Sequence, residues 1–144
     1  MPVCLGLDYG LRRIGIAAGD TGRRLAFAVT THVEGRDGSV LELLRSLVAE
    51  RGVQRIVVGL PLTADGREAD LAGRARGFAA LLGRELGLEV VLWDERYSSA
   101  EADRWLPTGR KGGKEARDAL AAEIILQSYL DSTAAGGDGT EAGA

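Results

Sequence analysis

The sequence predicts an α/β domain built on a mixed five-stranded sheet with helices on both faces. Two observations support this prediction: three short apolar strands open the chain, and helical and strand-like segments then alternate. A length of 144 residues is sufficient for one domain with its own hydrophobic core. We place this domain at residues 1–131 and expect residues 132–144, which are rich in Gly and Ala, to form a disordered tail.

The first half of the chain predicts three strands and one helix. The strands are expected at residues 3–8, 13–19 and 25–31, with glycine-containing turns between them. Because these turns are short, neighbouring strands should be antiparallel. From Val40 the apolar residues follow helical spacing, and Gly52 marks the end of this helix.

The second half predicts a regular alternation of strands and helices. It contains strands at residues 55–59 and 88–93, a long helix at 68–86, a short helix ending near 106, and a last helix at 114–130. The resulting order, β-β-β-α-β-α-β-α-α, is typical of ribonuclease-H-like domains and close to that of other small α/β folds.

Composition excludes several classes of protein. The single cysteine, Cys4, rules out a disulfide framework or a cysteine-based zinc site and favours the reducing cytoplasm. No stretch approaches the ~18 apolar residues of a membrane span, so no membrane partner is expected. The net charge of −3 argues mildly against nucleic-acid binding. However, residues 96–117 carry six basic and three acidic side chains, which is typical either of a solvated face or of a phosphate-binding surface.

Acidic side chains end two of the predicted strands. Asp8 lies at the carboxyl end of the first strand, where open α/β sheets bind ligands; a turn-forming Asp is an equally good interpretation. Asp94 and Glu95 end the fifth strand, and the strand period allows only one of them to share Asp8's side of the sheet. Alternatively, Asp94 caps the next helix and Glu95 pairs with an arginine.

A third acid, Asp118, starts the apolar stripe that continues through Ala122, Ile125 and Tyr129 of the last helix. An ionised carboxylate there needs a metal, a cation or water, although the helix dipole also favours an acid in the first turn. The only histidine, His32, closes the third strand, and we expect it at the surface rather than as a catalytic base.

These acids could converge at one edge of the sheet. Because clustered carboxylates repel one another, they call for a compensating cation, and an all-oxygen ligand set suits Mg²⁺ or Mn²⁺ rather than zinc. Such ions support phosphodiester cleavage by stabilising the attacking and leaving oxygens. The basic stretch could hold a phosphate backbone by charge without reading bases.

Four ordered motifs resemble the YqgF/RuvX family. They are Gly6-Leu7-Asp8-Tyr9-Gly10 with Arg13-Ile14-Gly15-Ile16-Ala17, then Gly59-Leu60-Pro61, then Asp94-Glu95-Arg96-Tyr97-Ser98-Ser99, and finally Lys111 to Leu130. The resemblance runs from about Val3 to Asp131. It implies a ribonuclease-H-like nuclease related to Holliday-junction resolvases, in a family associated with maturation of the 5′ end of pre-16S ribosomal RNA.

Carried over by position, the resemblance implies that Asp8, Glu95 and Asp118 are the catalytic and metal-binding acids, with Asp94 as the alternative to Glu95. The basic residues expected to contact phosphates are Arg12, Arg13, Arg96, Lys111 and Lys114. Many ribonuclease-H relatives carry an acid after the fourth strand. This chain has Gly59-Leu60-Pro61 there, and its nearest acid is Asp65.

The function that these features favour is a Mg²⁺- or Mn²⁺-dependent nuclease acting on structured RNA, in 5′-end processing of pre-16S ribosomal RNA. Three alternatives remain at this point. The same site could cut four-way DNA junctions, for which symmetric cleavage needs two active sites. A nucleotide-binding unit of the actin-like type is disfavoured because such proteins duplicate the domain. A non-catalytic RNA-binding factor in ribosome assembly is the third. The sequence leaves the oligomeric state open.

Overall fold

The computed structural model describes residues 2–61, 70–95 and 113–134. The strands are β1 (Val3–Asp8), β2 (Arg13–Asp20), β3 (Leu25–Val33), β4 (Val53–Leu60) and β5 (Glu89–Asp94). The helices are α1 (Val40–Arg51), α2 (Asp70–Leu86) and α4 (Gly113–Ala134). The predicted short helix before residue 106 lies outside the described residues. Among the helices described, none has the length and apolar character needed to cross a membrane.

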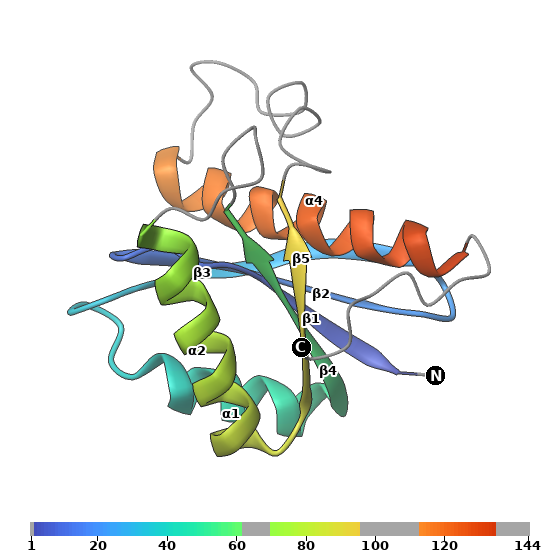
Figure 1. The fold of residues 1–144 in the computed structure, drawn as a ribbon, viewed down its shortest axis with the longest axis horizontal. Coiled ribbons are helices and arrows are strands. Elements are labelled where there is room, and N and C mark those ends of the chain that lie inside the picture. Colours follow the sequence, from blue (N-terminus) through green and yellow to red (C-terminus); the bar gives the residue numbers. More distant parts are fainter. Residues whose placement is uncertain (1, 62–69, 96–112, 135–144) are drawn as a thin grey trace.

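The five strands form one mixed sheet in the order β3-β2-β1-β4-β5. The pairs β1–β2 and β2–β3 are antiparallel because short turns connect them, whereas β1–β4 and β4–β5 are parallel because helices connect them. In Figure 1, α4 covers one face of this sheet while α1 and α2 cover the other. The predicted mixed five-stranded sheet with helices on both faces is confirmed.

Side-chain alternation divides the core into two parts. On β1, Leu5 and Leu7 join the core beneath α1 and α2, and Cys4 joins the core beneath α4. On β5, Val90 belongs to the first core. Val91 and Trp93 of the same strand belong to the second core, which α4 supplies with Ala122, Ile125, Leu126, Tyr129 and Leu130.

Most element ends agree with the sequence prediction. Ser39 caps α1 by accepting a hydrogen bond from the backbone N–H of Glu42, and Gly52 ends the helix at a φ of 65°. The last helix is longer than predicted, since α4 continues to Ala134 and residues 132–134 are helical rather than part of the tail.

The predicted surface position of His32 is wrong, because its side chain is fully buried. His32 lies opposite Ile14 across the β2–β3 pair, so both side chains point to the same face of the sheet, the face covered by α1 and α2. Its Nε2 lies 2.9 Å from Oε1 of the half-exposed Glu34. Nδ1 is buried and has no hydrogen-bond partner among the described residues.

Candidate active site

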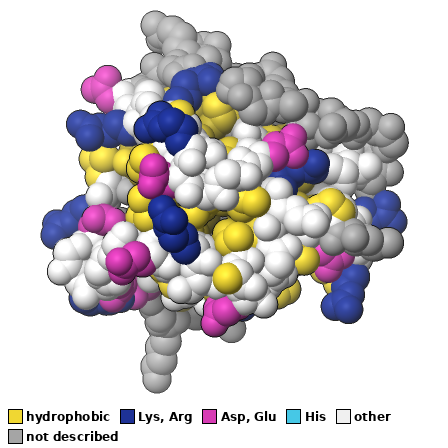
Figure 2. All heavy atoms as spheres, turned by 90° about the horizontal axis from the view of Figure 1, so that it is seen from below, with side chains coloured by type: hydrophobic (Ala, Val, Ile, Leu, Met, Phe, Trp, Pro, Cys, Tyr) yellow, Lys and Arg dark blue, Asp and Glu magenta, His cyan; other side chains and the backbone are white. Residues whose placement is uncertain are grey.

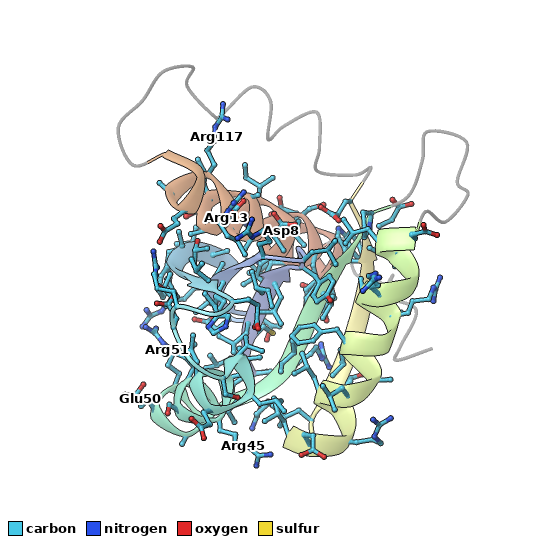
Figure 3. The ribbon with its side chains drawn as sticks, turned by 90° about the vertical axis from the view of Figure 1, so that its left-hand side faces the viewer. Asp8, Arg13, Arg45, Glu50, Arg51 and Arg117 are labelled. Atoms are coloured by element: carbon cyan, nitrogen blue, oxygen red, sulfur yellow. The ribbon has the colours of Figure 1, made fainter. Side chains whose placement is uncertain are left out.

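A cleft that carries acidic side chains opens at the carboxyl end of β1. It has a volume of about 590 Å³ and lies between the β1–β2 connection, the start of α2 and the start of α4. Its lining consists of Asp8, Tyr9, Gly10, Leu11, Arg12, Arg13, Asp70, Leu71, Arg74 and Asp118. Figure 3 shows Asp8 between the two helices, with Arg13 beside it under α4. The cleft therefore combines carboxylates with several guanidinium groups.

The structure brings Glu95, rather than Asp94, to Asp8. Asp8 follows Gly6 on the α4 face of β1, and Glu95 follows Trp93 on the same face of β5. The backbone N–H of Glu95 donates a 3.1 Å hydrogen bond to the carbonyl oxygen of Leu60, which extends the β4–β5 pairing by one residue. The side chains of Asp8 and Glu95 are joined by a hydrogen bond.

Gly59 makes room for the Glu95 side chain. A Cβ atom at position 59 would lie 3.0 Å from Cγ of Glu95 and 2.7 Å from Cδ1 of Ile125. Any side chain on β4 at this point would therefore displace the carboxylate or the helix. The fourth-strand motif, in which the sequence lacks an acid, thus supplies space for the acid of the fifth strand.

Burial raises the pKa values of both carboxyls, and neighbouring negative charges, Glu95 and Asp118 for Asp8 and Asp94 for Glu95, add to the shift. Burial contributes most to Asp8, followed by the charges of Glu95 and Asp118, and these raise its pKa from 3.8 to about 8. Burial is also the largest cause for Glu95, whose pKa rises although its hydrogen bond with Asp8 opposes the shift. This hydrogen bond raises the pKa of Asp8 and lowers that of Glu95, so the protonation of one carboxyl depends on that of the other.

Asp118 lies on the opposite wall of the same cleft. The backbone of α4 presses on β2 here, and a Cβ atom at Gly15 would collide with the Asp118 carbonyl oxygen. The Nε atom of Arg13 donates a 2.6 Å hydrogen bond to Oδ2 of Asp118, and both side chains are about one-quarter to one-third exposed. Asp118 therefore pairs with a cationic side chain from β2. From the sequence alone, its partner could have been a metal, a cation or water.

The acidic side chains of the site meet only part of the requirements for binding a hard divalent cation. Asp8 and Glu95 offer carboxyl oxygens joined by a hydrogen bond, and such oxygens are ligands for Mg²⁺ and Mn²⁺. Asp118 is close enough to raise the pKa of Asp8, but it pairs with Arg13. Within residues 2–61, 70–95 and 113–134, no group of three His, Cys, Asp or Glu side chains is arranged to hold a metal ion.

The expected phosphate-binding residues are only partly placed. Arg12 and Arg13 line the cleft as expected. Arg96 and Lys111 lie outside the described residues, and Lys114 is in the first turn of α4 with its side chain not described. Figure 2 views the molecule from the α1 and α2 side, where acidic and basic side chains are intermingled. Arg12 and Arg13 are therefore the expected phosphate contacts that the described part of the chain places at the cleft.

Arg74 is a cleft residue that the sequence analysis missed. It is exposed on α2 and lines the wall opposite α4. Helices that follow parallel strands begin near the carboxyl edge where ligands bind. Arg74 lies one turn into the helix that follows β4, and this position could have predicted that it lines the cleft.

Comparison with known proteins agrees with this architecture. A protein of Anaeromyxobacter sp. (strain K), named "Putative pre-16S rRNA nuclease", is 44% identical over 133 residues, covering 90% of this chain and 97% of its own. Relatives with the same name from Koribacter versatilis and Chloroflexus aggregans are 40% and 43% identical and cover 88% and 89% of this chain, and 85% and 92% of their own lengths.

Solved structures support the fold. The structure titled "T. thermophilus RuvC in complex with Holliday junction substrate" aligns with a TM-score of 0.61 at 13% identity, covering 99% of both chains. A second Thermus thermophilus RuvC structure gives a TM-score of 0.62 at 12% identity, covering 97% of this chain and 99% of that one. The fold and the relatives place the chain among ribonuclease-H-like nucleases.

The family can be stated directly. The family model RuvX, described as Holliday junction resolvase, matches residues 2–132, and the chain belongs to this family.

Proposed function

We propose that this protein is a metal-dependent nuclease that hydrolyses phosphodiester bonds in the cleft at the end of β1. The observation that supports this most strongly is the hydrogen-bonded pair of two partly buried carboxyls, Asp8 and Glu95, whose pKa values are both raised. Partly buried acids with raised pKa values cost stability, and Asp8 lines an open cleft, so this pair favours a functional role. Asp118 on the facing wall adds a third acid.

In this proposal, Asp8 and Glu95 hold the cation, and Asp118 completes the site when it leaves Arg13. When bound, Mg²⁺ or Mn²⁺ supplies a Lewis acid that activates water and polarises the phosphate. Arg12 and Arg13 contact phosphate oxygens by charge and by paired N–H donors, which orients the backbone without reading sequence. Arg96, Lys111 and Lys114 extend the phosphate contacts along the strand.

The substrate we propose is the 5′ region of pre-16S ribosomal RNA in the cytoplasm. The names of the relatives at 40–44% identity support this substrate. The buried, unpaired thiol of Cys4 agrees with a reducing compartment.

Cleavage of four-way DNA junctions is the second candidate. It is favoured by the description of the matching family and by the junction bound to the Thermus thermophilus neighbour. Symmetric cutting of a junction requires two active sites, so it requires a dimer at the working concentration. Sedimentation of the protein with and without a synthetic junction distinguishes this candidate from a monomeric RNA nuclease.

The experiment that tests the proposal compares wild-type protein with the Asp8→Asn variant on precursor ribosomal RNA and on a synthetic junction. Asn has nearly the same shape but lacks the charge, so cleavage in Mg²⁺ should fall at least about 100-fold while the circular dichroism spectrum is unchanged. Equal cleavage by both proteins would refute the assignment of the site. RNA binding by both with cleavage by neither would instead favour a non-catalytic assembly factor.

A further inference from the structure

A second cavity adjoins the acidic cleft on the side of α1 and α2. It has a volume of about 390 Å³ and shares Tyr9, Gly10 and Leu11 with the cleft. The β1–β2 connection is therefore a common wall between the two. A ligand bound in the cleft could extend into the cavity across this connection.

The two cavities differ in chemistry. The cleft is lined by carboxylates and arginines, whereas the second cavity is lined mainly by apolar and aromatic side chains. These include Leu11, Ile14, Val40, Leu41, Phe78 and Leu81. A charged compartment beside an apolar one matches the two parts of a nucleotide, namely its phosphate and its flat base.

Aromatic rings form a fixed part of this wall. The rings of Tyr9 and Phe78 lie 4.9 Å apart between centroids at an interplanar angle of 36°. Leu11, at the boundary between the cavities, is 59% exposed and is one of the large apolar side chains left open to solvent. Stacking of a base on an aromatic ring contributes about 1–3 kcal/mol in proteins that bind single strands.

Glu34 supplies a carboxylate on the wall of this mainly apolar cavity. Its Oε1 lies 2.9 Å from Nε2 of the buried His32, which fixes the carboxylate in place. An ionised carboxylate only accepts hydrogen bonds, so it favours a base edge that carries an amino group, as cytosine does, over uracil, whose matching position is an acceptor.

We infer that this second cavity is a subsite for an unstacked nucleobase of a single-stranded segment, and that Glu34 favours amino-bearing bases there. The inference rests on the proposed nuclease function, since the phosphate of the same nucleotide occupies the acidic cleft. This subsite would distinguish between bases, whereas the other contacts proposed for the site are made by charge.

The test measures binding of fluorescently labelled RNA hexamers in EDTA, which prevents cleavage. Wild-type protein is compared with Leu11→Ala, with Glu34→Gln, and with Leu25→Ala as the control, because Leu25 is similarly exposed but lies on the edge strand β3. The probes are oligo(C), oligo(U) and an abasic strand of equal length and charge.

Wild-type protein should bind oligo(C) about tenfold more tightly than the abasic strand, and Leu11→Ala should reduce this ratio to about threefold or less. Leu25→Ala should keep the wild-type ratio. Glu34→Gln should reduce the preference for oligo(C) over oligo(U) while leaving the affinity for the abasic strand unchanged.

Two results would overturn the inference in distinguishable ways. If wild-type protein binds all strands equally and still cleaves RNA in Mg²⁺, the base subsite is wrong and the proposed function stands. If it neither binds the strands nor cleaves RNA or a junction, the proposed function is itself wrong, and the subsite falls with it.

Discussion

The two faces of the sheet are packed in different ways. Beneath α1 and α2, branched aliphatic side chains such as Leu5, Leu7 and Ile56 fill the space between helix and sheet. Beneath α4, glycines bring the helix backbone against the strands, as at Gly6 and Gly15. On the first face, large side chains fill the space between the helices and the sheet. On the second face, glycines allow α4 to lie closer to the strands.

This difference explains where the acids lie. Asp8 and Glu95 lie on the α4 face and Asp118 lies on α4 itself, where the helix approaches the strands closely, and Asp8 and Asp118 line one cleft. We therefore expect substitutions on the α4 face to affect the site, and substitutions in the core beneath α1 and α2 that line neither cavity, such as at Leu44, to affect stability alone.

The largest effect is expected for Gly15→Ala. The added methyl group would collide with the Asp118 carbonyl oxygen, so α4 must shift, and unfolding free energy should fall by about 3 kcal/mol with loss of cleavage. Urea denaturation and a cleavage assay measure the two effects. Gly73→Ala on α2, where a Cβ meets nothing within 4 Å, is the control and should gain about 0.5–1 kcal/mol. A stable, active Gly15→Ala variant would refute the close packing of α4 as the cause.

A loss of stability without loss of cleavage is expected for Leu44→Ala. Leu44 is fully buried in the core on the other face, so its truncation should cost about 2–4 kcal/mol. Below the unfolding transition, cleavage per folded molecule should equal that of the wild type. A fall in kcat of the folded variant would show that the two faces are coupled.

The smallest effect is expected for Arg13→Ala. Removing the guanidinium frees Asp118 from its 2.6 Å partner, so Mn²⁺ should bind about threefold to tenfold more tightly in the absence of nucleic acid. The same variant should bind RNA more weakly and with a reduced salt dependence, because one phosphate contact is lost. Titration calorimetry measures the first change and fluorescence anisotropy the second. Unchanged Mn²⁺ affinity would separate Asp118 from the metal site.

Much of the fold was predictable because periodicity reports directly on burial. The strand period placed Asp8 with Gly6, and Glu95 with Trp93, but it could not decide which face of β5 would match which face of β1. That choice depends on the handed crossover through α2. The Arg13–Asp118 pair was equally inaccessible, since it joins residues 105 positions apart through the way α4 crosses β2. The burial of His32 was missed because a strand-end residue is buried or exposed according to the helices packed above it.

In the proposed function, Asp8 lowers the stability of the folded protein and binds a cation. Burial and neighbouring charges raise the pKa of Asp8 from its ordinary value of 3.8 to about 8 in the folded protein. Between about pH 4 and pH 8, the unfolded chain therefore releases a proton that the folded protein retains. The unfolding free energy of the wild type should fall through this range as pH rises, and Asp8→Asn removes this loss.

The most direct measurement is the unfolding temperature of wild type and Asp8→Asn at pH 5 and pH 8, with and without Mg²⁺ at a concentration that supports cleavage. Without Mg²⁺, the variant should be more stable by about 1–3 kcal/mol at pH 8, and this advantage should shrink at pH 5. Added Mg²⁺ should raise the unfolding temperature of the wild type at pH 8 and leave the variant unchanged. A variant less stable than the wild type at pH 8, or one equally stabilised by Mg²⁺, would contradict the role assigned to Asp8.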